Sequence, residues 1–189
     1  MHASICDQLH DLVQNAIEAG ASRVCVLWRD TGRWQEIVIS DNGCGMTAEV
    51  QERVTDPFFT DGTKHPGRKV GLGLAFLRQM VLETGGSWNL ESEPGMGTTV
   101  SFRLDQTHWD VPPAGDVVSA IAGLMAFEGE YDLVVTRATR RDRYEVRRAD
   151  LREALGELET ATSLGMLRDY IASQEEALQK GQNHGRHDT

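Results

Sequence analysis

The sequence of 189 residues lacks any apolar run near the roughly 18 residues that a membrane-spanning helix needs. It also lacks a charged start followed by an apolar block, which is the pattern of an export signal. Its three cysteines, Cys6, Cys25 and Cys44, have no CxxC spacing and leave one unpaired, which disfavours a disulfide framework and a structural zinc site. We therefore expect a cytoplasmic protein that makes no membrane contact.

The sequence also has fewer basic than acidic residues. The chain has 19 Lys and Arg against 29 Asp and Glu, a formal net charge of −10. Nucleic acids and anionic membranes reward positive charge, so we expect neither as a main partner. An arginine-rich stretch between Arg137 and Arg152 is interleaved with acids such as Asp142 and Glu145, and Tyr144 is its one aromatic residue. We interpret it as a solvated, ion-paired hairpin.

Hydrophobic periodicity predicts helices where apolar residues recur three and four apart, and strands where they alternate. In the first part of the chain the expected helices span residues 5–19, 47–56 and 73–84, and the expected strands span residues 23–29, 34–40, 88–92 and 99–104. This order predicts an α+β fold, a two-layer α/β sandwich in which helices lie on one face of a mixed, mostly antiparallel sheet.

Pro112 and Pro113 interrupt the pattern and indicate a strap between two parts of the chain. Beyond them the periodicity predicts a helix, two strands and two amphipathic helices, a small αββαα segment. We therefore expect an N-terminal domain over residues 1–107, an accessory α+β segment over residues 108–180 and a flexible tail over residues 181–189.

Two glycine motifs indicate a nucleotide pocket. The run from Asp41 to Met46 follows an expected strand, where a carboxylate can accept a hydrogen bond from an exocyclic amine and glycines let the backbone approach a flat ring. The run from Gly71 to Leu74 opens an expected helix, where free backbone N–H groups and the helix dipole favour phosphate.

Asp11 and Asn15 lie one turn apart on the first expected helix, so both side chains leave the same face. An Asn carbonyl is a competent ligand for Mg²⁺, which prefers oxygen donors and keeps waters beside substrate phosphates. A carboxylate one turn earlier could orient or deprotonate an attacking water. Alone, the pair reads as a solvated helix face; with the two glycine motifs downstream, we favour the metal and water roles.

Together these motifs resemble the GHKL superfamily, the ATP-binding (Bergerat-type) fold shared by gyrase, the heat-shock chaperone, sensor histidine kinases and MutL. The resemblance covers about residues 8–104, with a MutL-like N box at residues 11–21 and further motifs at residues 41–45, 56–59, 71–74 and 95–99. It implies that Asn15 holds Mg²⁺ and that Asp41 accepts the adenine amino group. The other nucleotide-binding residues it implies are Gly43, Gly45, Met46, Phe59, Lys64, Arg68, Lys69, Gly71, Leu72, Gly73, Leu74 and Thr98 or Thr99.

The resemblance leaves the activity open between three alternatives. The first is an enzyme that hydrolyses Mg-ATP slowly or transfers its phosphoryl group to a protein partner, with Asp11 as catalytic residue. The hydrolysing members have Glu at that position, and Asp reaches one methylene less, which disfavours fast hydrolysis. The second is a nucleotide-gated interaction module with little turnover. The third is a kinase that borrows a phosphoacceptor histidine from another chain, since only about seven residues precede the region of the resemblance. The partner is not specified, and a homodimer stays open.

Overall fold

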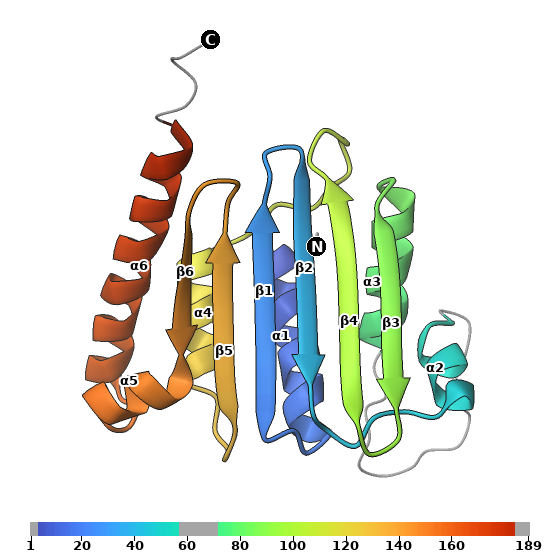
Figure 1. The fold of residues 1–189 in the computed structure, drawn as a ribbon, viewed down its shortest axis with the longest axis horizontal. Coiled ribbons are helices and arrows are strands. Elements are labelled where there is room, and N and C mark those ends of the chain that lie inside the picture. The colour runs from blue at the N-terminus through green and yellow to red at the C-terminus, as the bar shows by residue number, and fades with distance from the viewer. Residues whose placement is uncertain (1–3, 57–71, 184–189) are drawn as a thin grey trace.

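The computed structural model describes residues 4–56 and 72–183, which form six helices and six strands (Figure 1). In chain order the elements are α1 (Ile5–Glu18), β1 (Arg23–Asp30), β2 (Trp34–Asp41), α2 (Ala48–Val54), α3 (Leu72–Glu83), β3 (Ser87–Glu93), β4 (Gly97–Asp105), α4 (Val117–Met125), β5 (Asp132–Ala138), β6 (Arg143–Arg147), α5 (Arg148–Leu155) and α6 (Ala161–Asn183). No helix within the described ranges is both long and apolar enough to cross a membrane.

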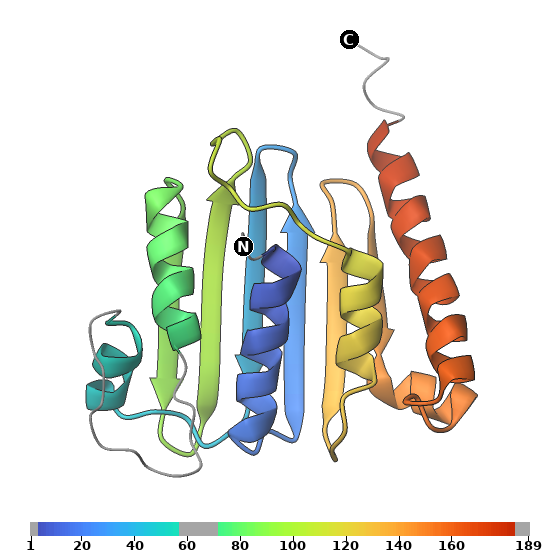
Figure 2. The same ribbon diagram turned by 180° about the vertical axis from the view of Figure 1, so that it is seen from behind.

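All six strands form one sheet in the order β3-β4-β2-β1-β5-β6. Neighbouring strands run antiparallel except β1 and β5, which are parallel. Helices α3, α1 and α4 lie side by side over one face of this sheet, and Figure 2 shows that face from the helix side. The predicted α+β sandwich, with a mixed, mostly antiparallel sheet and helices on one face, is therefore confirmed.

The core lies between this sheet face and the helices, because side chains alternate along each strand. On β1, Val24, Val26 and Trp28 are buried beneath the helices, whereas Cys25 and Leu27 face the other side and are half-buried. Helix α1 buries its apolar stripe at a spacing of three and four residues. The polar side of α1 is left facing outward.

Residues 108–180 continue the sheet of the first hundred residues, because β5 pairs with β1 and β6 pairs with β5. The strap before α4 also closes the start of α1: the N–H groups of Ile5 and Cys6 donate to the carbonyls of Pro113 and Ala114, each at 3.0 Å. Ser4 adds a side-chain cap. Helix α1 therefore begins with its first N–H groups satisfied by residues over a hundred positions later.

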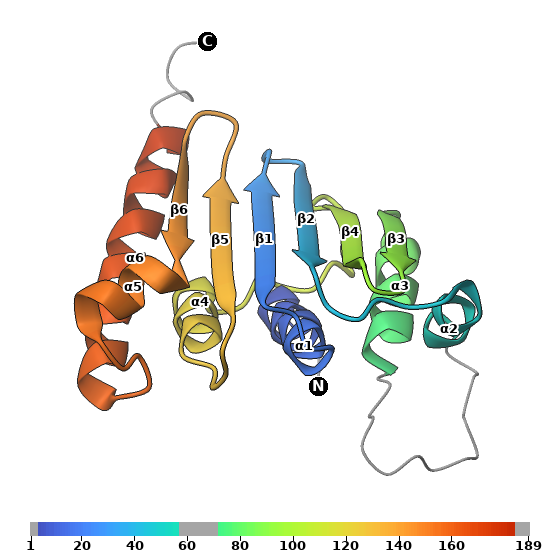
Figure 3. The ribbon, with the colours of Figure 1, turned by 60° about the horizontal axis from the view of Figure 1, so that its bottom comes forward.

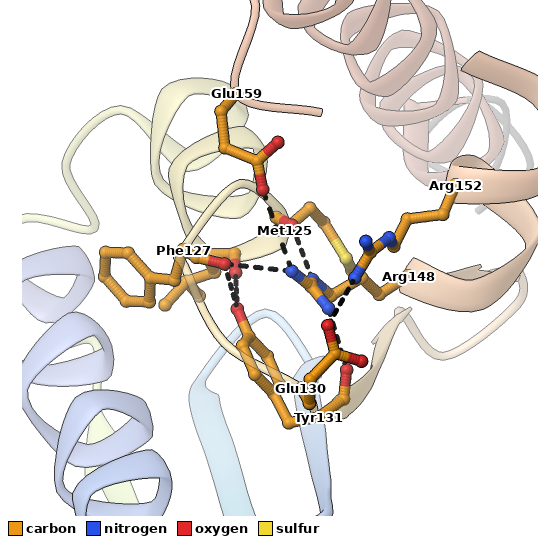
Figure 4. Close-up of polar contacts among 8 residues, drawn as sticks. Met125, Phe127, Glu130, Tyr131, Arg148, Arg152 and Glu159 are labelled. Carbon is orange, nitrogen blue, oxygen red and sulfur yellow. Dashed lines mark hydrogen bonds and ion pairs between the residues drawn. The ribbon is translucent and has the colours of Figure 1, made fainter. Parts of the chain in front are cut away.

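Two arginines of the stretch that we expected to be solvated are buried, so that expectation was wrong for them. The Arg148 guanidinium donates to the carbonyls of Met125, Phe127 and Tyr131, each at 2.9 Å, and fastens the end of α4 to the start of β5 (Figure 4). Arg137 forms a two-pronged ion pair with another buried side chain, Glu175 of α6, at 2.8 and 3.1 Å.

Candidate functional site

Several element ends meet at one edge of the molecule, seen at the bottom of Figure 1 and from below in Figure 3. They are the C-terminal ends of α1, β2 and β3 and the N-terminal ends of β4 and α3. Strand pairing places Asp41 of β2 opposite Thr98 of β4, and Thr98 opposite Ser92 of β3. Directly paired residues share a face, and the buried Val100 two residues on marks this face as the helix side. Asp41, Thr98 and Ser92 thus form a row under the helices.

Thr99 was the alternative to Thr98 in the sequence analysis. It pairs with Ser40 and Glu91 and so faces the opposite side of the sheet from Asp41. The pairing therefore brings only one of the two threonines, Thr98, beside Asp41.

The Asp41 carboxylate is held in place by backbone donors. Its Oδ1 accepts the Gly43 N–H at 2.7 Å, and the Thr98 N–H also donates to the carboxylate. Burial raises the pKa of Asp41, and these two hydrogen bonds oppose the rise by favouring the charged form. A side chain at position 43 would crowd this carboxylate and Ala19, because a Cβ there would lie 2.9 Å from Oδ1 and 3.0 Å from the Ala19 Cβ.

Gly45 and Gly97 allow two loops to pack backbone against backbone. A Cβ on Gly45 would overlap the carbonyl oxygen of Glu93, and a Cβ on Gly97 would overlap that of Asp41. Both glycines also have positive φ, +64° and +108°, which side chains disfavour. These glycines therefore fix the loop that follows Asp41 against the turn between β3 and β4.

A hydrogen-bond network braces that loop from β3. The Met46 N–H donates to Ser92 Oγ at 2.9 Å, and Ser92 Oγ lies 2.9 Å from both the Gly97 carbonyl oxygen and Thr98 Oγ1. Gln51 Nε2 donates to the carbonyls of Ser92 at 2.8 Å and Met46 at 3.2 Å. Neither Ser92 nor Gln51 was predicted from the sequence to belong to this site. The signal for Ser92 was its place two residues after Leu90, on the inward side of an alternating strand.

Asp11 and Asn15 face the same edge from α1. Asp11 is exposed and Asn15 is half-buried. A Cβ on Gly73 would lie 3.9 Å from Asp11 Oδ2, so the start of α3 lies beside the outer face of α1. Within the described ranges neither the Asp11 nor the Asn15 side chain has a hydrogen-bond or ion-pair partner. Both side chains keep their oxygens available at this edge.

Five residues implied by the resemblance lie outside the described residues: Phe59, Lys64, Arg68, Lys69 and Gly71. Helix α3 begins at Leu72, so Leu72, Gly73 and Leu74 form its first turn, where backbone N–H groups lack partners within the helix. The half-buried Leu74 side chain packs against the core, so of this residue only the backbone N–H is a candidate phosphate contact.

No cluster of three or more His, Cys, Asp and Glu side chains able to hold a metal occurs among residues 4–56 and 72–183. A magnesium ion carried by a nucleotide needs fewer protein ligands, because phosphate oxygens and waters complete its shell. The unpartnered amide oxygen of Asn15 fits such a site.

A separate hollow of about 400 Å³ lies on the open face of the sheet, over β1, β2, β5 and β6. Cys25, Val38 and Val134 form part of its lining. These residues alternate with the buried ones that face the helices, so the hollow and the row of Asp41, Thr98 and Ser92 lie on opposite sides of the sheet.

The edge described above lies within a region that matches a known protein family. Residues 5–108 match the family described as histidine kinase-, DNA gyrase B- and HSP90-like ATPases. The chain belongs to this family of ATPases. This ATPase family region begins with α1 and ends just after β4, so it contains every residue of the edge described above. Residues 5–108 are accordingly a histidine kinase-like, ATP-binding domain.

Sensor kinases are among the curated relatives of this chain. The signal transduction histidine-protein kinase AtoS of Escherichia coli is 35% identical over 99 residues, which are 51% of this chain and 16% of AtoS. The sensor kinase CckA of Brucella abortus is 43% identical over 66 residues, which are 35% of this chain and 7% of CckA. The chain thus spans a small fraction of the length of these curated relatives.

Among solved structures, the N-terminal domain of a DNA repair protein superposes with a TM-score of 0.55 at 16% identity. The superposition covers 85% of this chain and 58% of that one, more than the ATPase family region alone. It therefore shows that the fold likeness continues beyond residue 108.

Proposed function

We propose that the protein binds Mg-ATP at the edge formed by α1, α3 and the Asp41 row, and that it either hydrolyses ATP slowly or transfers the phosphoryl group to a protein partner. The observation that carries this proposal is the juxtaposition of two features. A fixed carboxylate, Asp41, lies at the end of β2. Asp11 and Asn15, whose side chains have no partner among the described residues, lie one turn apart on α1, and Asp11 lies beside the start of α3.

The proposed roles follow from the chemistry of each group. The Asp41 carboxylate accepts the adenine amino group, with Gly43, Gly45 and Met46 forming the wall along the ring. The first turn of α3 favours phosphate oxygens through its free N–H groups. Asn15 supplies an oxygen ligand to the magnesium ion that accompanies those phosphates. Bound Mg²⁺ would neutralise charge that develops on the phosphoryl group.

Asp11 is the proposed catalytic residue, because its exposed carboxylate lies one turn before Asn15 and beside Gly73. There it could orient a water molecule or a partner hydroxyl toward the terminal phosphate. Its short side chain places that nucleophile less favourably than a glutamate would, and small misplacements are costly in rate. We therefore expect slow turnover.

We further propose that the protein acts in the cytoplasm. All three cysteines are free thiols, and Cys44 is exposed, which suits a reducing compartment.

Calorimetric ATP titrations and phosphate release, both with and without Mg²⁺, test the proposal. Asn15→Ala should abolish the magnesium dependence of ATP affinity. Asp11→Asn should keep ATP affinity within about twofold and lower phosphate release or transfer by about 10²-fold. Gln14→Ala, an exposed neighbour on the same helix, is the matched control and should change neither. If wild type binds no ATP, or if Asp11→Asn turns over normally, the proposal is wrong.

The second candidate is a nucleotide-gated interaction module, favoured by the exposure and short reach of Asp11. In that case Mg-ATP would change the affinity for a protein partner while wild type releases no phosphate. Incubation with labelled ATP and co-purifying proteins separates the alternatives. An acid-labile, base-stable label indicates histidine phosphate from a borrowed acceptor, whereas an acid-stable label indicates serine phosphate. Sedimentation with and without ATP reports whether the protein is a homodimer.

A further inference from the structure

The geometry points to Ser92 as a positioning residue that fixes the direction of the Thr98 hydroxyl and so makes the site select a 6-amino purine over a 6-oxo purine. This inference rests on the proposed function, because it concerns the base of the nucleotide placed beside Asp41. It assigns a specificity role to a residue that none of the glycine or acidic motifs contains.

The Ser92 hydroxyl carries a single proton. Ser92 Oγ lies 2.9 Å from the Gly97 carbonyl oxygen, which can only accept, so the proton must point there. Any other direction would set the lone pairs of two oxygens against each other at that distance. The Ser92 proton is therefore committed to Gly97.

Ser92 Oγ then has two lone pairs left, and both are used. One accepts the Met46 N–H at 2.9 Å. The other faces Thr98 Oγ1 at 2.9 Å, and since Ser92 has no second proton, the Thr98 hydroxyl must be the donor of this bond. The Thr98 proton thus points toward Ser92, and Thr98 can offer a ligand only lone pairs.

The neighbour of Thr98 in the row is also an acceptor. Asp41 lies opposite Thr98 across β2 and β4 on the same face. Burial raises the pKa of its carboxyl, and the two backbone N–H groups that the carboxylate receives oppose this rise by favouring the charged form. A carboxylate has about four lone-pair sites, so acceptor capacity remains for a ligand. A 6-amino group carries two N–H donors, so two acceptors that both face position 6 match a 6-amino purine and repel the carbonyl oxygen of a 6-oxo purine.

Removing the Ser92 hydroxyl changes this pattern without touching the ligand. In Ser92→Ala the Thr98 hydroxyl has lost its acceptor and can turn its proton toward the base. It can then donate to a 6-oxo group, while its lone pairs still accept from a 6-amino group. The affinity for ITP should rise relative to that for ATP, and the ATP-to-ITP affinity ratio should fall about tenfold, the value of one hydrogen bond of ordinary strength.

The experiment measures dissociation constants of Mg-ATP and Mg-ITP for the full chain by calorimetry. Wild type should prefer ATP, Ser92→Ala should lose about tenfold of that preference, and Ser87→Ala, an exposed serine on the same strand, should retain it. Equal weakening of ATP and ITP by Ser92→Ala would show a merely structural role and overturn the inference. Absence of binding of both nucleotides to wild type would instead refute the proposed function itself.

A double-mutant cycle with Thr98→Val tests whether Ser92 acts through Thr98. Thr98→Val removes the hydroxyl at nearly constant shape and should lower the ATP-to-ITP ratio by itself. Adding Ser92→Ala to it should change the ratio no further. Additive effects would contradict the inference. Should Ser92→Ala fail to fold in a thermal melt, Thr98→Val still decides: an unchanged ratio in that variant refutes an acceptor role for Thr98.

Discussion

Replacement of Arg148 by methionine should destabilise the protein strongly, because its side chain is only 2% exposed and its guanidinium donates to three backbone carbonyls. A buried carbonyl left without a donor costs about 1–3 kcal/mol. The Arg148 guanidinium also lies 4.2 Å from the centre of the Tyr131 ring. Methionine retains much of the apolar stem, so we expect the free energy of unfolding to fall by about 4 kcal/mol, in the range for breaking a buried charged network.

For a chain of this length about 1 kcal/mol corresponds to about 2–4 °C in melting temperature, so Arg148→Met should melt about 10 °C below wild type by circular dichroism. Arg152→Met is the matched control on the same helix (Figure 4). Its ion pair with Glu130 is 3.9 Å long and solvent-exposed, and such pairs contribute about 0–1 kcal/mol. Equal melting temperatures for the two variants would refute the conclusion that the hydrogen bonds of Arg148 hold the end of α4 to the start of β5.

Two further predictions concern the nucleotide edge and its surroundings. Burial raises the pKa of the Cys6 thiol from 9.0 to about 11, so a thiol reagent should modify the exposed Cys44 and spare Cys6 until urea unfolds the chain. Because the thiol ionises at lower pH in the unfolded chain, the contribution of Cys6 to stability should be lost as pH rises from 9.0 to about 11. Early labelling of Cys6, detected by mass spectrometry, would contradict its burial. Gly45→Ala should weaken ATP binding about tenfold or more in calorimetry, because its Cβ would overlap the Glu93 carbonyl and φ at this position is positive. Gly95→Ala, where φ is also positive but the space around the residue is open, should have the smaller effect. The reverse order of the two effects would contradict the loop packing.

Local structure could be predicted from the sequence. Apolar spacing located α1, and the alternation of the strands located β1 and β2, because both patterns depend only on residues within a few positions. The glycine run after Asp41 was readable for the same reason: the turn and the carboxylate it holds lie within three residues.

Contacts between distant residues were not readable. The pairing of Arg137 with Glu175 joins residues 38 positions apart, and the arginine-rich stretch around Arg137 therefore looked solvated. Ser92 looked like any strand serine until the pairing of β3 with β4 placed it beside Thr98. The parallel pairing of β5 with β1 was equally hidden, because no local pattern specifies which distant strand a segment joins.

The carbonyls of Pro113 and Ala114 accept hydrogen bonds from the first turn of α1, so this helix is held at its start by residues from the second part of the chain. Its anchored end lies nine residues before Asn15, about 14 Å along the axis at the usual helical rise. A fragment ending at residue 108 would leave two amides bare at the anchored end and strip β1 of its neighbour β5. A fusion of this ATPase region to another protein would therefore need to include the proline strap and β5.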